Sequence, residues 1–174
     1  MNRTLPLVLM AHLATAGAAW AAAPPPTKPV SITFYSGRWY EIARIPNAGQ
    51  RNCHAAYSQF IPSATGIFRV NQVCRRGSSM GPARTVSAKG RILPGSKGAR
   101  FELSFFGGLR KQEYWVVDRA DDLSWGLMAT PGGNYIWLLS REPVLDPAAR
   151  AGIVARVRTL GYRQALEFPA QPPA

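Results

Sequence analysis

Gly37-Arg38-Trp39-Tyr40-Glu41-Ile42-Ala43-Arg44 is the stretch that decides the fold of this 174-residue chain. Two aromatic residues and a short apolar run follow its glycine, a composition that favours a β-strand. A second stretch, Tyr135-Ile136-Trp137-Leu138-Leu139-Ser140-Arg141-Glu142-Pro143, follows about a hundred residues later and is equally rich in aromatic and branched side chains. We interpret the two stretches as the first and the last members of a series of strands.

Turn signals divide the chain between these stretches at near-regular intervals. Seven clusters of Gly, Pro, Asn, Ser or Asp separate eight runs rich in Val, Ile, Phe, Tyr and Trp, which is typical of an all-β sandwich or barrel. Every connection is short enough for a hairpin, so we expect an eight-stranded antiparallel up-and-down β-barrel able to hold one small ligand. The predicted strands cover residues 38–46, 53–61, 67–75, 83–93, 99–106, 112–118, 123–129 and 134–141.

Alternation of apolar and polar residues supports the barrel. Phe101, Leu103 and Phe105 share one face of a strand, and Glu102 and Ser104 share the other. The last three predicted strands are instead apolar on both faces. Their outer side therefore needs a cover.

The residues after the last strand predict this cover. Asp146 suits a helix N-cap, Pro147 suits the first helical position, and Gly161 suits the position after the helix end. An apolar stripe between them predicts one amphipathic C-terminal α-helix packed on the outside of the barrel. The stripe consists of Ala149, Ile153, Val157 and Leu160.

The Gly-x-Trp of residues 37–39, together with Arg141, resembles the signature of the lipocalin family. The longer stretches quoted above resemble the branch that holds bacterial lipocalins, plant temperature-induced lipocalins and apolipoprotein D, and the resemblance runs from about Tyr35 to about Tyr162. It implies structural roles for Gly37, Trp39 and Arg141: the indole plugs the closed end of the barrel and the guanidinium packs across its face, which is a favourable contact.

The resemblance also implies a ligand cavity, with Tyr57, Asn71 and Trp137 in its wall. Phe101, Leu103 and Phe105 join this wall by their alternation, and Tyr135 and Leu139 join it because they share the parity of Trp137. The aromatic groups would bury an acyl chain or a flat ring. Asn71 or Tyr57 could bind a headgroup by hydrogen bonding, and Arg69 or Arg75, of the same parity as Asn71, could meet a carboxylate or phosphate. The alternative is a barrel that its own side chains fill. The expected ligand-binding residues are Tyr57, Asn71, Phe101, Leu103, Phe105, Tyr135, Trp137 and Leu139.

Cys53 and Cys74 are the only cysteines of the chain. Reflecting the second and third strands about their turn brings the two cysteines close, and bacterial members of the resembled family often carry a similar pair. The chain start, described below, predicts export, and an oxidising compartment favours a disulfide. Strict alternation conflicts with this disulfide. If Tyr57 and Asn71 both point inward, Cys53 points inward and Cys74 outward, so a β-bulge or a loop position for Cys53 is needed.

The formal net charge is +12, which favours acidic partners. No nucleic-acid recognition motif is present, so nucleic acid is not expected as a partner. Peripheral contact of the basic face with an anionic membrane surface suits an exported protein, and a merely solvated face is the alternative. The basic face comprises Arg75, Arg76, Arg84, Lys89, Arg91, Lys97, Arg100, Arg110 and Lys111.

The chain start predicts export. Residues 1–23 combine Arg3, an apolar stretch and small residues at the cleavage region, as in a signal peptide. No lipobox cysteine stands there, so we expect a periplasmic or secreted protein that is soluble after cleavage. The remaining chain divides into a Pro-rich linker (24–34), a lipocalin domain (35–168) and a disordered tail (169–174).

No catalytic pattern is visible. His54 is the only histidine after the predicted signal peptide, and there is neither a Gly-x-Ser-x-Gly elbow nor a metal-binding set, so we expect no enzyme, metal or cofactor. The expected function is reversible binding of a fatty acid or lysophospholipid, for lipid transport, storage or scavenging in the cell envelope. Two alternatives stay open: an enzyme acting on a bound lipid or isoprenoid, which free thiols would favour, and an envelope-docking protein with a filled barrel.

Overall fold

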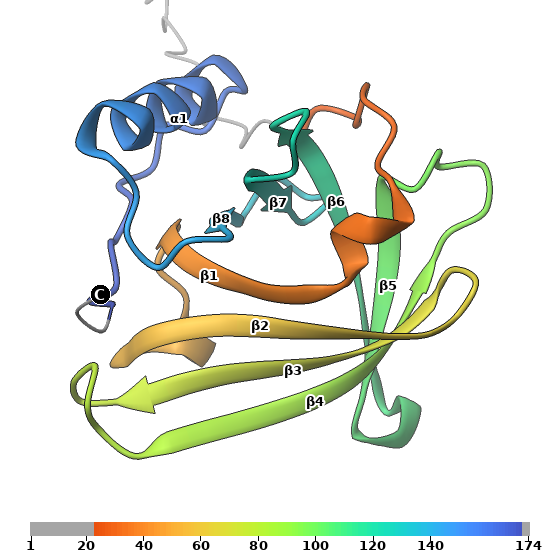
Figure 1. Ribbon diagram of the computed structural model, residues 1–174, viewed down its shortest axis with the longest axis horizontal. Helices are drawn as coiled ribbons and strands as arrows, with labels where there is room; N and C mark the ends of the chain where they lie inside the picture. Colours follow the sequence, from red (N-terminus) through yellow and green to blue (C-terminus); the bar gives the residue numbers. More distant parts are fainter. Residues whose placement is uncertain (1–22, 172–174) are drawn as a thin grey trace, which may run out of the picture.

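Eight antiparallel strands close into a barrel in the computed structural model, which describes residues 23–171 (Figure 1). Each strand pairs with the next in sequence and β8 pairs with β1, so the predicted up-and-down order is confirmed. The predicted strand bounds agree with the structure to within three residues. The strands are β1 (Gly37–Arg44), β2 (Cys53–Ala64), β3 (Ile67–Arg76), β4 (Ala83–Ile92), β5 (Arg100–Phe105), β6 (Arg110–Arg119), β7 (Trp125–Ala129) and β8 (Ile136–Ser140).

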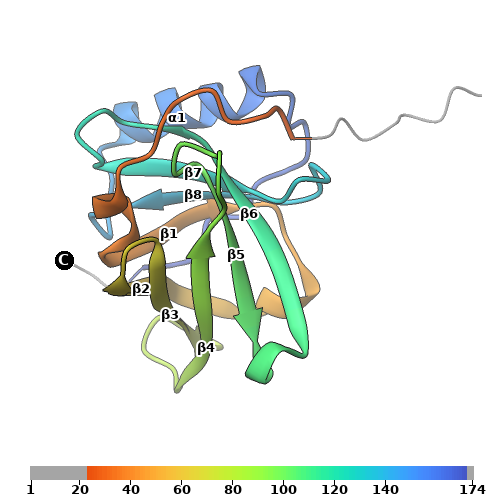
Figure 2. The same cartoon turned by 90° about the vertical axis from the view of Figure 1, so that its right-hand side faces the viewer.

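One helix covers the outer apolar face, as the sequence indicates. α1 (Pro147–Thr159) begins after Asp146, whose carboxylate accepts hydrogen bonds from the backbone N–H groups of Ala148 and Ala149. Ile153 and Val157 are buried against the outer side of β1 and β6–β8, while Ala149 is exposed. The helix therefore covers the strands that are apolar on both faces (Figure 2).

Trp39 closes one end of the barrel. Its side chain is fully buried, and its indole N–H donates to the carbonyl of Phe34 at 2.8 Å. The guanidinium of Arg141 lies 3.7 Å from the centroid of the indole ring and donates to the carbonyls of Ser36 and Arg38 at 2.7 and 2.9 Å. Gly37 has a φ of +69°, and a Cβ there would lie 3.3 Å from Arg141 Nη1, so both conformation and space favour glycine.

The segment predicted as a Pro-rich linker belongs to the barrel domain. Phe34, in the 3₁₀ helix η1 (Ile32–Tyr35), is fully buried beside Trp39. The carbonyl of Pro29 accepts two hydrogen bonds from Arg119, and the N–H of Val30 donates to the carbonyl of Lys97. The linker prediction is wrong because the strands by themselves leave the Trp39 end of the barrel unfilled. This segment crosses that end and fills it (Figure 2).

Asp118 ties this N-terminal segment to the helix. Its buried carboxylate accepts hydrogen bonds from Arg156 at 2.5 Å and from the Arg119 N–H at 2.9 Å, and pairs with Lys28 at 3.0 Å. Burial opposes ionisation, but these donors outweigh it and hold the pKa of Asp118 below its usual range.

The C-terminal segment also packs on the barrel, where the sequence predicted a disordered tail from residue 169. Pro169 is buried, and the carbonyl of Ala170 accepts a hydrogen bond from the N–H of Ala55 at 2.7 Å. The reason is that β2 leaves backbone donors free at its start, and the tail satisfies one of them. Residues 172–174 and the predicted signal peptide up to residue 22 lie outside the described residues, among which no helix is both long and apolar enough to span a membrane.

We expect Trp39→Ala to destabilise the protein by about 3–5 kcal/mol, because truncating a buried tryptophan leaves a cavity in the closed end. Thermal or urea unfolding measures the change. Trp137→Ala, at a partly buried position near the other end of the barrel, is the matched control and should cost less. Equal losses for the two variants would contradict the role of Trp39 as the plug.

We expect Asp118→Asn to lower the free energy of unfolding by about 1–2 kcal/mol at pH 7, since it weakens hydrogen bonds to two cations. The folded-state pKa of Asp118 is depressed, so this stabilisation is present above the unfolded-state pKa and is lost as pH falls through the folded-state pKa. Urea unfolding measured from pH 7 to pH 2 should therefore show the free energies of unfolding of the wild type and of Asp118→Asn becoming equal. Asp121→Asn, at a side chain that is 94% exposed, should have almost no effect.

Candidate functional site

A cavity of about 590 Å³ occupies the end of the barrel opposite Trp39. Its size lies within the range of small-molecule sites, roughly 300–1,000 Å³. The turns that follow β1, β3, β5 and β7 surround its opening, and we call these turns (45–52, 77–82, 106–109 and 130–135) the mouth. The apolar wall is formed by Val86, Phe105, Tyr114, Met128, Trp137 and Leu139, and polar lining comes from Glu41, Gln50, Ser58, Gln72, Gln112 and Thr130.

Stacked aromatic rings separate the cavity from the closed end. Tyr114 stacks on the fully buried Phe101, with ring centroids 5.5 Å apart, and its ring lies 5.8 Å from that of Trp137. Burial raises the pKa of Tyr114 to about 12, against the opposing charge of Arg110, so its hydroxyl is neutral at physiological pH. The barrel is therefore filled between Trp39 and Tyr114, and hollow between Tyr114 and the mouth.

The structure separates the expected ligand-binding residues into three groups. Phe105, Tyr135, Trp137 and Leu139 line the cavity. Phe101 and Leu103 also point inward, but they are buried in the core between the cavity and Trp39 and are absent from its lining. The inward direction predicted from their alternation is confirmed, but the barrel is filled at their level by rings from η1, β2 and β3.

Tyr57 and Asn71 form the third group, of which Tyr57 belongs to the cavity lining and Asn71 does not. Tyr57 borders the cavity, but its ring lies 6.2 Å from that of Tyr40, and the guanidinium of Arg38 lies 4.3 Å from its centroid. Asn71 accepts a hydrogen bond from Ser87 at the outer surface and is not part of the lining. The expected inward direction of Asn71 is wrong.

The cause is the parity of β3. Phe68 and Val70 fill the core, so the alternate residues Arg69, Asn71 and Arg75 point outward. The alternation of Phe68 and Val70 with polar neighbours carries this signal in the sequence. The arginines that border the cavity are instead Arg76, Arg84 and Arg110.

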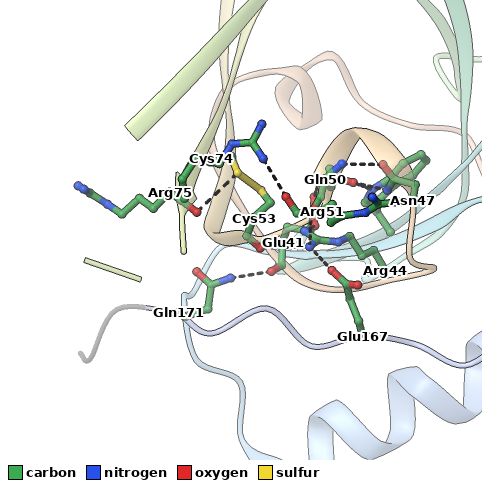
Figure 3. Close-up of a disulfide and its surroundings, with 12 residues drawn as sticks. Glu41, Arg44, Asn47, Gln50, Arg51, Cys53, Cys74, Arg75, Glu167 and Gln171 are labelled. Atoms are coloured by element: carbon green, nitrogen blue, oxygen red, sulfur yellow. Dashed lines mark hydrogen bonds and ion pairs between the residues drawn. A yellow bond between two sulfur atoms is a disulfide. The ribbon is translucent and has the colours of Figure 1, made fainter. Parts of the chain in front are cut away.

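Cys53 and Cys74 form a disulfide beside the cavity, with their Cα atoms 5.3 Å apart (Figure 3). The pairing of β2 with β3 shifts register between His54 and Tyr57, and this bulge resolves the conflict in alternation. Both cysteines of the chain are thereby oxidised.

A polar network, which the sequence did not predict, fixes one turn of the mouth. Gln50, at the end of the 3₁₀ helix η2 (Ala48–Gln50), donates to Glu41 at 2.7 Å and accepts from the Trp137 indole N–H at 2.9 Å. The buried Arg44 donates to Glu41 and Glu167 and to the carbonyls of Gln50 and Cys53 (Figure 3). Burial raises the pKa of Glu41, while Arg44 and Gln50 oppose that shift. The network joins β1, β8 and the C-terminal segment to the mouth.

The rim of the cavity is positively charged. Within residues 23–171, neither Arg84 nor Arg110 has an acidic group within ion-pairing distance, and Arg76 donates to the carbonyl of Arg51 at 2.8 Å. No cluster of three or more metal-binding side chains occurs in the described part of the chain. The site can thus bury an apolar group and attract an anion at its opening.

Comparison with known proteins agrees with this architecture. Residues 30–171 match the family described as "Lipocalin-like domain". The chain is 29% identical to the outer membrane lipoprotein Blc of Vibrio cholerae, over 71% of this chain and 73% of that protein. It is 27% identical to apolipoprotein D of Rattus norvegicus, over 81% of each chain. Among solved structures, insecticyanin from the tobacco hornworm Manduca sexta has the same fold, with a TM-score of 0.68 at 15% identity, over 85% of this chain and 84% of that one. The chain belongs to the lipocalin family.

Proposed function

We propose that this lipocalin reversibly binds one amphiphilic molecule with an anionic headgroup, a fatty acid or a lysophospholipid. The observation that carries the proposal is the combination of an aromatic cavity of about 590 Å³ with Arg76, Arg84 and Arg110 at its rim. The apolar part of the ligand would lie against Trp137 and Leu139, and the headgroup would lie at the arginines.

Burial of the acyl chain supplies the affinity. An acyl chain that buries about 300 Å² gains roughly 7 kcal/mol at about 25 cal/mol per Å², before the entropic cost of binding is subtracted. Additional polar contacts are available from the side chains of Ser58, Gln72 and Gln112, which line the cavity. Dissociation constants in the micromolar range are therefore expected.

The two alternative functions have less support. An enzyme that uses a free thiol is disfavoured because both cysteines are in the disulfide. A barrel filled by its own side chains is disfavoured by the cavity between Tyr114 and the mouth. Reversible binding of a lipid, for transport, storage or scavenging, is the function that the site supports best.

A role in the cell envelope is the setting we propose, in the periplasm or after secretion. Relatives named outer membrane lipoprotein Blc support it, including those from Vibrio cholerae and from Escherichia coli K12, the latter at 28% identity over 92% of each chain. The predicted signal peptide of residues 1–23 is consistent with it.

Arg110→Gln should weaken binding of dodecanoate about tenfold and leave binding of dodecanol unchanged, because only the carboxylate forms a charge-assisted contact with the arginine. Quenching of tryptophan fluorescence or isothermal titration calorimetry measures both ligands. The pair of ligands separates headgroup recognition from burial of the chain.

Lys89→Gln is the control for that experiment, since it removes one positive charge from the outer wall of β4, away from this cavity. It should leave both affinities unchanged. If dodecanoate and dodecanol lose affinity equally in Arg110→Gln, or if Lys89→Gln has the same effect, the headgroup does not lie at the rim arginines.

A further inference from the structure

Three large apolar side chains project from two turns of the mouth. Met80 is 78% exposed, Phe106 is 66% exposed and Leu109 is 90% exposed. Met80 lies in the turn between Arg76 and Arg84, and Phe106 and Leu109 lie in the turn before Arg110, so residues that border the cavity flank both turns. Figures 1 and 2 place both turns along the same lower edge of the barrel.

The backbone holds Phe106 outward at a cost. Its φ is +50°, in the left-handed region that disfavours a bulky side chain, and Gly107 and Gly108 continue at positive φ. A glycine or asparagine would satisfy this turn without strain. The ring of Phe106 is nevertheless held there, 66% exposed at the border of the cavity and 6.2 Å from the ring of Phe105.

Acidic residues are distributed unevenly between the two ends of the barrel. None of the four turns of the mouth contains Asp or Glu, and the span from Ile42 to Phe101 contains no acidic residue at all. The acidic residues Asp121, Asp122 and Glu142 lie in segments at the closed end. The turns of the mouth therefore present cations without carboxylates of their own, which favours contact with a negatively charged surface. The basic residues in and beside the turns of the mouth are Arg51, Arg75, Arg76, Arg84 and Arg110.

The outer wall of the barrel is less suited to such a surface. Arg91 and Lys111, both part of the predicted basic face, lie 3.2 and 3.8 Å from the carboxylate of Glu102. Their charge is thus partly neutralised, whereas Arg84 and Arg110 have no acidic partner among the described residues. The apolar tips and the unpaired cations coincide at the mouth.

We propose that the mouth docks on an anionic phospholipid bilayer, with Met80, Phe106 and Leu109 inserted below the headgroups and the arginines among the phosphates. Separate apolar tips ringed by cations suit a fluid bilayer, which accommodates each tip singly, whereas a protein partner would require one continuous apolar patch. The cavity would then open onto lipid. That last consequence rests on the proposed function, but the docking itself does not.

Sedimentation of the full chain with vesicles tests the docking. Vesicles of phosphatidylcholine with about 30% phosphatidylglycerol should bind the protein, and pure phosphatidylcholine should bind it weakly. The double variant Met80→Ser/Leu109→Ser should bind the anionic vesicles on the order of tenfold more weakly, since it removes two apolar anchors. Neither residue lines the cavity, so the affinity of this variant for dodecanoate should be unchanged.

Ile32→Ser/Ile67→Ser is the matched control, because these residues are 47% and 50% exposed and lie away from the mouth. It should bind vesicles as the wild type does. Absence of binding to anionic vesicles, equal losses in both double variants, or a dimer that forms without vesicles and dissociates in the mouth variant would each overturn the docking. Vesicle binding without dodecanoate binding would instead reject the proposed function and leave the docking in place.

Discussion

The packing of Arg141 on the buried indole of Trp39 is the contact on which the rest of the structure depends. It connects the first strand to the segment after the last, at the place where the barrel closes, and the same guanidinium binds the backbone of residues 36–38. Phe34 fills the space beside the indole, so the N-terminal segment becomes part of the closed end. Because this end is filled with aromatic rings, the barrel is stable without filling its other end.

The open end therefore combines stability with free volume. Its rigidity comes from polar contacts: Gln50 bridges Glu41 and Trp137, Arg44 is surrounded by acceptors, and the disulfide joins β2 to β3. These interactions join the wall to one turn of the mouth, beside the cavity. The same end has an excess of positive charge and exposed apolar tips, so the ligand site and the proposed membrane contact are adjacent.

The sequence predicts the parts of this molecule that repeat or that bear a motif. Regular turn signals give eight strands, the Asp146-Pro147 pair gives the start of the helix, and the Gly-x-Trp with Arg141 points to the closed end. The sequence is less informative where a single inserted residue reverses which side chains of a strand point into the barrel. The bulge near Ala55 interrupts the alternation of β2, and the inward direction of β3 is set by Phe68 and Val70, which places Asn71 on the outer face. Contacts between distant segments, such as Arg119 with Pro29 or Arg44 with Glu167, have no local signature.

Native mass spectrometry of the protein purified without detergent, titrated with a fatty acid and with a lysophospholipid, tests most directly whether the open half of the barrel is a ligand site. We expect a saturable one-to-one adduct with at least one of the two lipids, weakened in Trp137→Ala, whose side chain forms part of the cavity wall. The absence of any adduct with either lipid, or an adduct that is the same in Trp137→Ala, would contradict this account.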